Sequence, residues 1–159
     1  MKDALQEEKL VKGEITIGEY VGLDKERQYE IARKGYELIE TGRLEEAETI
    51  YKGLVAADPY DSVFHCQLGA IYFRKQDFNS AFERFDDSIR LNKANVDALA
   101  GRGELFLMKQ EYELGIVDLK QAVENDPHGK KQSSIRARAI LLSLRDAVEE
   151  RQTEMETEH

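Results

Sequence analysis

The sequence predicts an all-α protein in which three helical hairpins stack side by side into a superhelix. The first observation is a period of 34 residues, at which small residues recur as Gly35, Gly69 and Gly103. The second is that each period holds two amphipathic stretches separated by a short polar turn. The third is composition, because 35% of the 159 residues are charged and 41% are apolar, which is typical of a helix-rich soluble domain.

The central period, residues 61–91, shows the pattern most clearly. Its two expected helices flank a polar turn at residues 75–77. Three further kinds of position recur 34 residues apart, namely large apolar residues at Leu38, Tyr72 and Phe106, small residues at Ala47, Ala81 and Gly115, and large apolar residues at Tyr51, Phe85 and Leu119. Pro59 and Pro127 lie two periods apart. This arrangement is typical of the tetratricopeptide repeat, and three repeats are present.

The spacing has a mechanical reason. Two antiparallel helices approach closely only where one side of the crossing lacks bulk, so Gly69 and Ala81 allow contact while Tyr72 and Phe85 fill the space beside them. Each hairpin then has an apolar face left over. Stacking on the next hairpin buries that face and produces a concave groove lined by the first helix of each repeat.

The chain divides into three expected parts. Residues 1–24 form an N-terminal helical segment and linker, residues 25–127 hold repeats at about 28–61, 62–95 and 96–129, and residues 130–159 form a C-terminal capping helix with an acidic tail.

The repeat boundaries carry their own signals. In the first repeat we expect helices at 25–40 and 44–57, with Gly42 in the left-handed conformation at the turn between them. Pro59 separates the first two hairpins, and Asp61 or Ser62 caps the next helix. The third repeat is expected to hold helices at 95–109 and 112–124.

The segments outside the repeats carry weaker patterns. A short amphipathic helix is expected at 2–12, ended by Gly13, and residues 14–24 read as a linker or irregular connection. A capping helix is expected at 133–152, because a solenoid needs a polar outer face at its open end. The tail at 153–159 is expected to fray.

Charge and cysteine content exclude several classes of protein. A formal charge of −9 without a net basic face argues against nucleic-acid binding. The single cysteine, Cys66, excludes an internal disulfide and fits a reducing compartment. No apolar run has the length of a signal peptide or a membrane span, so stable membrane insertion is not expected and the cytoplasm is the expected location.

No constellation of residues indicates an enzyme. His65 and Cys66 are neighbours, and neighbours on a helix point about 100° apart, so they do not face each other as base and nucleophile. His128 and His159 have no second ligand at zinc-like spacing, and no glycine-rich loop joins a strand to a helix. We expect no catalytic residue, no metal site and no cofactor.

The groove is the remaining candidate site. Four places on the first helix of a repeat normally face the concave side; they hold Tyr29, Ala32, Tyr36 and Ile39 in the first repeat, Val63, Cys66, Ala70 and Phe73 in the second, and Asp97, Ala100, Glu104 and Leu107 in the third. The first two sets are apolar or aromatic, which favours an extended peptide with apolar anchors. The alternative, that residues 5–21 fold over this face and fill it, stays open.

A narrower resemblance rests on three stretches of sequence: residues 58–70 (DPYDSVFHCQLGA), 42–47 (GRLEEA) and 10–13 (LVKG). They resemble the class II, or translocator, chaperones of bacterial type III secretion, and the similarity covers nearly the whole chain. The resemblance implies a holdase that keeps a hydrophobic, pore-forming translocator subunit soluble before export. It also implies that the groove residues Tyr29, Tyr36, Val63, Cys66, Ala70 and Phe73 grip a short extended segment.

Two features leave alternatives open. The groove places lack the Lys and Asn residues of the carboxylate clamp with which similar repeats hold the acidic C-terminus of a heat-shock chaperone, so that role is excluded. Asp97 and Glu104 make the third repeat more polar than a purely apolar binding surface requires. A tetratricopeptide scaffold that binds a soluble partner is therefore the second hypothesis. Pairing of two copies through the N-terminal helix is open as well, because Leu5, Leu10 and Val11 suit either pairing or docking within the chain.

Overall fold

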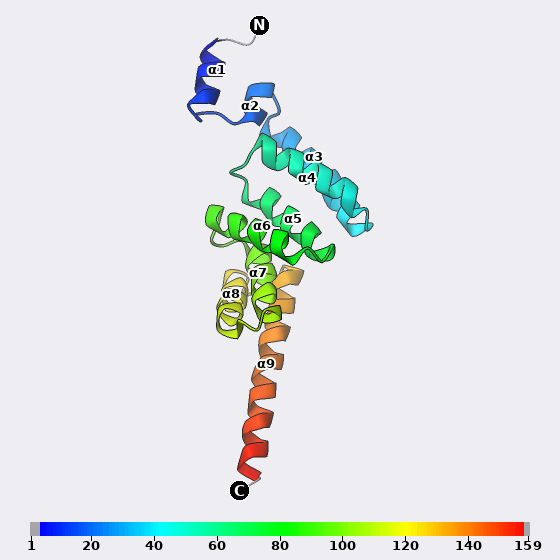
Figure 1. Cartoon of the computed structure of the whole chain (residues 1–159), viewed down its shortest axis with the longest axis vertical. Helices are drawn as coiled ribbons and strands as arrows, with labels where there is room; N and C mark the ends of the chain where they lie inside the picture. Colours follow the sequence, from blue (N-terminus) through cyan, green and yellow to red (C-terminus); the bar gives the residue numbers. More distant parts are fainter. Residues whose placement is uncertain (1–3, 158–159) are drawn as a thin grey trace. The chain divides into compact units, whose positions relative to one another are not determined.

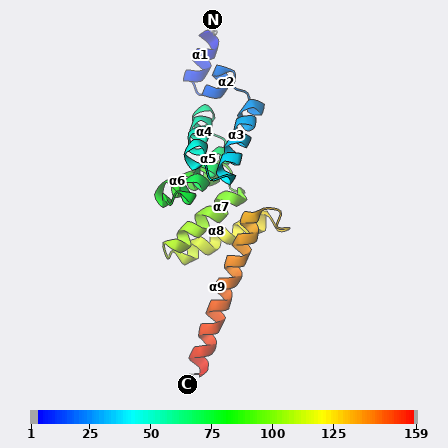
Figure 2. The same ribbon diagram turned by 90° about the vertical axis from the view of Figure 1, so that its right-hand side faces the viewer.

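A computed structural model describes residues 4–157, and in that range the secondary structure consists of α-helices with no strand. The contacts divide the chain into two compact units, residues 1–92 and 93–159. Figures 1 and 2 show the helices of each unit in two views. The units are described separately below.

The first unit holds the N-terminal helices and two hairpins: α1 (Ala4–Val11), α2 (Ile17–Val21), α3 (Lys25–Glu40), α4 (Leu44–Ala57), α5 (Ser62–Arg74) and α6 (Phe78–Leu91). The helices α3 and α4 form one hairpin and α5 and α6 the next, while α4 also packs on α5. The bounds of α3 and α4 are those expected from the sequence. Asp61 is the residue that caps α5, because its side chain accepts a hydrogen bond from the Val63 N–H.

The second unit holds the third hairpin and a long final helix: α7 (Val96–Met108), α8 (Tyr112–Asn125) and α9 (Gln132–Thr157). The first part of α9 packs on both helices of the hairpin. Ala137 lies 34 residues after Gly103 and is fully buried, so α9 begins in the register of the first helix of a fourth hairpin. The expectation of an all-α tetratricopeptide fold with a capping helix is confirmed.

The small residues of the repeat lie where the helices touch. A Cβ atom added to Gly69 would lie 2.8 Å from a ring carbon of Phe85, and one added to Gly35 would lie 2.8 Å from a ring carbon of Tyr51. Tyr51 is buried and its hydroxyl donates a 2.8 Å hydrogen bond to the Ala32 carbonyl. In the first two hairpins a large ring of the second helix therefore fills the space left by a glycine of the first, and in the third hairpin Leu119 takes the same place opposite Gly103.

The turns inside the hairpins repeat as well. Gly42, Gln76 and Gln110 are 34 residues apart and have φ angles of 77°, 63° and 64°. The expected left-handed conformation at Gly42 is confirmed, and the same conformation recurs in the next two turns although glycine does not.

Two expectations for the ends of the chain are corrected. Residues 14–24 contain the helix α2, which the side chains of Thr16 and Glu19 begin with a reciprocal pair of hydrogen bonds to the backbone. The tail expected to fray from 153 belongs to α9 as far as Thr157, because α9 runs without interruption to that residue. Residues 2–3 of the expected first helix, and 158–159 of the tail, lie outside the described residues. No helix in residues 4–157 is both long and apolar enough to span a membrane.

Candidate functional site

Eight of the twelve predicted groove residues lie on α3 and α5 in the first unit, and they fall into two groups. Tyr29, Tyr36 and Val63 are exposed at 41%, 49% and 39%, and Ala70 and Phe73 are half-buried. The other three, Ala32, Ile39 and Cys66, are buried at 6%, 2% and 3%. Ala32 and Ile39 belong to the hydrophobic core that α3 shares with α4 and α5. The exposed and half-buried group is called the apolar strip below.

The helices α3 and α5 lie side by side and run in the same direction. Near the start of both, the Tyr29 hydroxyl donates a 2.9 Å hydrogen bond to Asp61, and the Tyr29 ring centroid lies 5.4 Å from that of Phe64. Near the end of both, Arg74 donates a 2.8 Å hydrogen bond to the Ile39 carbonyl. The apolar strip therefore spans two adjacent parallel helices, which gives it length along the helices and width across them.

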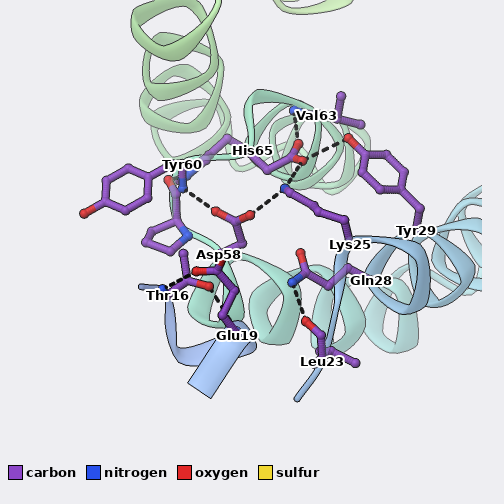
Figure 3. A network of polar contacts seen from close by, with 12 residues as sticks. Thr16, Glu19, Leu23, Lys25, Gln28, Tyr29, Asp58, Tyr60, Val63 and His65 are labelled. Carbon is purple, nitrogen blue, oxygen red and sulfur yellow. Dashed lines mark hydrogen bonds and ion pairs between the residues drawn. The ribbon is translucent and has the colours of Figure 1, made fainter. Parts of the chain in front are cut away.

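A polar network holds the N-terminal end of the strip in place (Figure 3). The Lys25 ammonium lies 2.5 Å from a carboxylate oxygen of Asp58 and 2.8 Å from one of Asp61, and 5.4 Å from the centroid of the Phe64 ring. These contacts join the start of α3 to the loop between α4 and α5. The sequence had marked Asp61 only as a helix cap, and Lys25 lies 36 residues earlier, so the pairing had no local signal.

The protonation of this network follows from burial and charge. Burial alone raises the pKa of Asp61, but hydrogen bonds from Lys25 and Tyr29, with the charge of Lys25, outweigh it and hold the pKa below its ordinary value of 3.8. Burial, followed by the hydrogen bond to Asp61, raises the pKa of the Tyr29 hydroxyl. At neutral pH Asp61 is therefore an acceptor and Tyr29 a donor, which fixes the orientation of the Tyr29 ring at the edge of the strip.

Four predicted groove residues lie on α7 in the second unit. Ala100 is buried, and Asp97 and Glu104 have partners in α9 or in the residue just before it. Glu104 accepts a 2.6 Å hydrogen bond from Arg136. Asp97, which the sequence had placed in the same groove, accepts from Lys131 at 2.8 Å and from Ser133. Leu107 is half-buried and packs toward Gly115, where an added Cβ would lie 2.7 Å from its δ carbon. These carboxylates attach α9 to α7.

The N-terminal segment does not cover the apolar strip. Within the described residues, α1 contacts α2, α2 contacts α4, and neither of them contacts α5. Gly18 of α2 packs closely, because an added Cβ would lie 2.8 Å from the Gln28 amide nitrogen and 3.0 Å from the Ala57 carbonyl oxygen. Leu5 and Val11 of α1 are exposed. The strip is accordingly open in this structure.

His65 and Cys66 take structural positions. The imidazole Nε2 lies 2.8 Å from the Pro59 carbonyl oxygen and Nδ1 lies 3.4 Å from Arg84, while the Cys66 side chain is buried. His65 thus ties α5 to the preceding loop and to α6. In residues 4–157 there is no group of three or more histidine, cysteine, aspartate or glutamate side chains placed to hold a metal ion.

Comparison with known sequences identifies the repeat. The tetratricopeptide repeat family matches residues 31–61. The chain is 31% identical over 86 residues to the tetratricopeptide repeat-containing protein trd-1 of Caenorhabditis elegans, covering 54% of this chain and 10% of that protein. It is 24% identical over 127 residues to human RNA polymerase II-associated protein 3, covering 80% of this chain and 19% of that protein. The chain thus spans a fifth or less of the length of these curated relatives.

Comparison with solved structures gives similar folds over most of the chain. The type III secretion translocator chaperone SycD of Yersinia enterocolitica matches with a TM-score of 0.71 and 20% identity, covering 80% of this chain and 97% of SycD. SycD in complex with a peptide of the translocator YopD matches with a TM-score of 0.67 and 19% identity, covering 77% and 95%. The first tetratricopeptide domain of Spaghetti (RPAP3), bound to the HSP90 peptide SRMEEVD, matches with a TM-score of 0.64 and 25% identity, covering 76% and 95%. The expected resemblance to translocator chaperones is confirmed at the level of the fold.

Proposed function

We propose that this protein is a peptide-binding chaperone that holds an extended segment of a hydrophobic, translocator-type protein on its apolar strip. The observation that carries the proposal is the exposure of Tyr29, Tyr36 and Val63 on two adjacent parallel helices. Exposed aromatic and branched side chains on neighbouring helices can each contact a different apolar side chain of an extended peptide. The similarity in fold to SycD, including SycD in complex with a YopD peptide, supports the same mode of use.

The chemistry of the strip favours apolar anchors over an acidic terminus. Binding a terminal carboxylate calls for clustered Lys and Asn side chains, and the corresponding places on α3 and α5 hold Ala32, Tyr36, Cys66 and Ala70. Lys25 at the end of the strip is already neutralised by Asp58 and Asp61. An acidic peptide such as SRMEEVD would therefore find little charge to bind, despite the similarity in fold to the domain that holds it.

The energetics fit a reversible holdase. Burying each apolar anchor contributes about 25 cal/mol per Å² of apolar area, while ordering the bound segment opposes it. A dissociation constant of roughly 1–100 μM for a single peptide follows, and a longer cargo with several contacts binds more tightly. Such binding needs no cofactor and no chemical step.

The test compares two fluorescein-labelled peptides by anisotropy, one carrying the YopD segment that SycD binds and one with the sequence SRMEEVD. The proposal expects the translocator peptide to bind at least tenfold more tightly. Tyr36→Ala and Phe73→Glu should each weaken that binding at least tenfold, while circular dichroism stays unchanged. Tyr112→Ala is the matched control, because Tyr112 of α8 is 52% exposed and Tyr36 is 49% exposed.

Two outcomes would overturn the proposal. Equal loss of binding in Tyr36→Ala and Tyr112→Ala would show that the strip is not the site. Tighter binding of SRMEEVD than of the translocator peptide would favour the scaffold hypothesis, in which the chain binds a soluble partner. A cell-based check is co-purification with the wild type and with Phe73→Glu, followed by mass spectrometry for a membrane-active secreted protein that the variant loses.

A further inference from the structure

The helix α9 has two parts with different surroundings. Its buried residues are Ser133, Ser134 and Ala137, all within the first two turns. The C-terminal end of the helix extends past the ends of α7 and α8, as Figures 1 and 2 show within the second unit. Capping the third hairpin accounts for the first part of α9 and leaves the second part unexplained.

The 34-residue period allows the first part of α9 to be compared with α5, place by place. Phe64, Leu68 and Ile71 of α5 are buried. Two periods later, α9 has Gln132, Arg136 and Ala139 at the same places, and all three are exposed. On α5 these places belong to the core shared with α3 and α4, whereas on α9 they are exposed to solvent.

An apolar groove lies elsewhere, between α8 and the middle of α9. It has a volume of about 600 Å³. Its apolar lining comes from Ile116 of α8 and from Leu141, Leu142, Leu144 and Val148 of α9. The apolar residues of α9 also have the 3-4-7 spacing of a coiled-coil seam, at Leu141, Leu144, Val148 and Met155. Val148 and Met155 are 55% and 69% exposed. Such a seam is shaped to pack against another helix.

The rim of the groove is basic. Lys120 of α8 and Arg138 and Arg145 of α9 line it together with one acidic residue, Glu149. Arg138 donates a 3.2 Å hydrogen bond to the Pro127 carbonyl, and Arg145 contacts Asp146 and Glu149 of its own helix in exposed pairs. Exposed pairs of this kind contribute little to stability, so they exchange readily for contacts with an incoming helix. The groove thus fits an amphipathic helix with acidic flanks.

The chain itself contains such a helix. From residue 132 to 145, α9 carries three arginines and no acidic residue. From 146 to 157 it carries Arg151 and five acidic residues, which are Asp146, Glu149, Glu150, Glu154 and Glu156. Two copies of α9 laid antiparallel place the acidic half of each beside the basic half of the other. A two-fold axis makes both contacts at once, which is the usual symmetry of a homodimer.

We propose that two copies of this protein associate through an antiparallel pairing of their α9 helices, with the acidic half of each helix seated along the groove between α8 and α9 of the other. We assign a second copy of the chain to the groove for two reasons. The groove has an apolar lining and a basic rim. The second half of α9 has both an apolar row of side chains and the acidic residues that would match them. This interface uses neither the N-terminal helix nor the apolar strip. It is independent of the peptide-binding proposal.

The charged contacts of this dimer are exposed, so its affinity depends on ionic strength. Ions screen exposed charges beyond about 10 Å at 0.1 M salt and beyond about 3 Å at 1 M. Dimerisation should weaken as salt is raised. A dimer held by apolar contacts alone would keep or gain affinity under the same change.

The first experiment is sedimentation equilibrium of the full chain between roughly 1 μM and 1 mM, a range that covers weak, transient association. Val148→Glu should weaken the dimer at least tenfold. Val117→Glu is the matched control, since Val117 of α8 is 52% exposed and lies outside the groove, and it should leave the dimer unchanged. A monomeric wild type over this range, or equal effects of the two variants, would overturn the proposal.

The second experiment tests orientation by exchanging charge. Arg138→Glu with Arg145→Glu leaves Arg136 and Arg151 as the basic residues of α9 and makes the helix largely acidic. Glu150→Arg with Glu154→Arg makes it largely basic. Each double variant alone should dimerise at least tenfold more weakly than the wild type at low salt. An equimolar mixture should restore association as a heterodimer, detected by labelling one of the two. The antiparallel pairing would be excluded if each double variant still formed homodimers as tightly as the wild type, or if the mixture of the two stayed monomeric.

Discussion

Val63 and Asp97 occupy the same place in consecutive repeats, and so do Ala70 and Glu104, yet their surroundings differ. On α5, Val63 is 39% exposed and belongs to an open apolar strip. On α7, Asp97 and Glu104 are bound by Ser133 and Arg136 of α9 and by Lys131, which precedes that helix. The place in the repeat decides the side of the helix on which a residue lies. The helix that packs next decides whether that residue can reach a ligand.

The same places of the repeat therefore have different uses in the two units. On α3 and α5 this side of the helices presents apolar groups, which gain by being covered by a partner chain. On α7 the same side of the helix presents carboxylates, which are stabilised by pairing with the basic side chains of Lys131 and Arg136. These pairs attach the capping helix to α7. The same repeat thus serves as binding surface in one unit and as anchor in the other.

The largest expected effect comes from the core beneath the strip. Phe64 is fully buried, whereas its neighbour Val63 lies on the strip. Phe64→Ala should lower the free energy of unfolding by about 3–5 kcal/mol, because it leaves a cavity between α3 and α5. Val63→Ala should change it by less than about 1 kcal/mol. Urea unfolding of both variants checks the assignment, and equal losses would mean that Val63 belongs to the core.

A smaller effect is expected at the polar network that holds the strip. Asp61→Asn keeps a helix-capping side chain but removes the charge that Lys25 and Tyr29 contact, so stability at pH 7 should fall by about 1 kcal/mol.

The same variant gives a pH dependence with a defined sign. The pKa of Asp61 is lower in the folded protein than its ordinary value of 3.8, so the stabilisation is fully present above the unfolded-state pKa. It is lost as the pH falls through the folded-state pKa. The stability difference between wild type and Asp61→Asn should therefore be constant from pH 7 to about 5 and should shrink below about pH 4. A difference that grows on acidification would contradict this account.

On α7 the expected effect is smaller again. Asp97→Ala removes the exposed pair with Lys131 and the hydrogen bond from Ser133, and should cost about 0.5 kcal/mol overall. Its effect should concentrate at the start of α9. Hydrogen exchange there should speed up while exchange in α3 and α5 stays unchanged. Uniform acceleration over the chain would show that Asp97 supports the whole fold.

The smallest effect on stability is expected on the strip itself. Tyr36→Ala should change the free energy of unfolding by no more than about 0.5 kcal/mol, because the side chain is exposed at the surface of α3. Thermal unfolding is the measurement. A loss of several degrees would place Tyr36 in the core and would remove it from the peptide-binding surface.

The period of 34 residues predicted the hairpins well, because the small residues at Gly35, Gly69 and Gly103 and the large residues opposite them satisfy a local requirement of helix contact. The short helix α2 was predicted as a linker. Its signal was present, since Thr16 and Glu19 have the spacing of a capping box, but two glycines in the same segment argued for a turn.

The candidate site was harder to predict than the fold. Ala32, Ile39 and Cys66 have the periodicity of groove residues, but the close packing of α3 against α4 and α5 buries them. The partners of Asp97 and Glu104 lie 32–36 residues later on a helix whose docking no local pattern reports. Exposure depends on neighbouring helices, so periodicity within one helix does not determine it.

The left-handed turns have a consequence for engineering. In this conformation a non-glycine residue costs roughly 1–2 kcal/mol, and glycine adopts it freely. The first turn already has Gly42, whereas Gln76 and Gln110 carry backbone strain. Replacing each with glycine would relieve that strain at the expense of a more flexible unfolded chain, for a net gain of a few tenths of a kcal/mol per turn. Thermostability can thus be added at two hairpin tips without changing a residue of the strip or of α9.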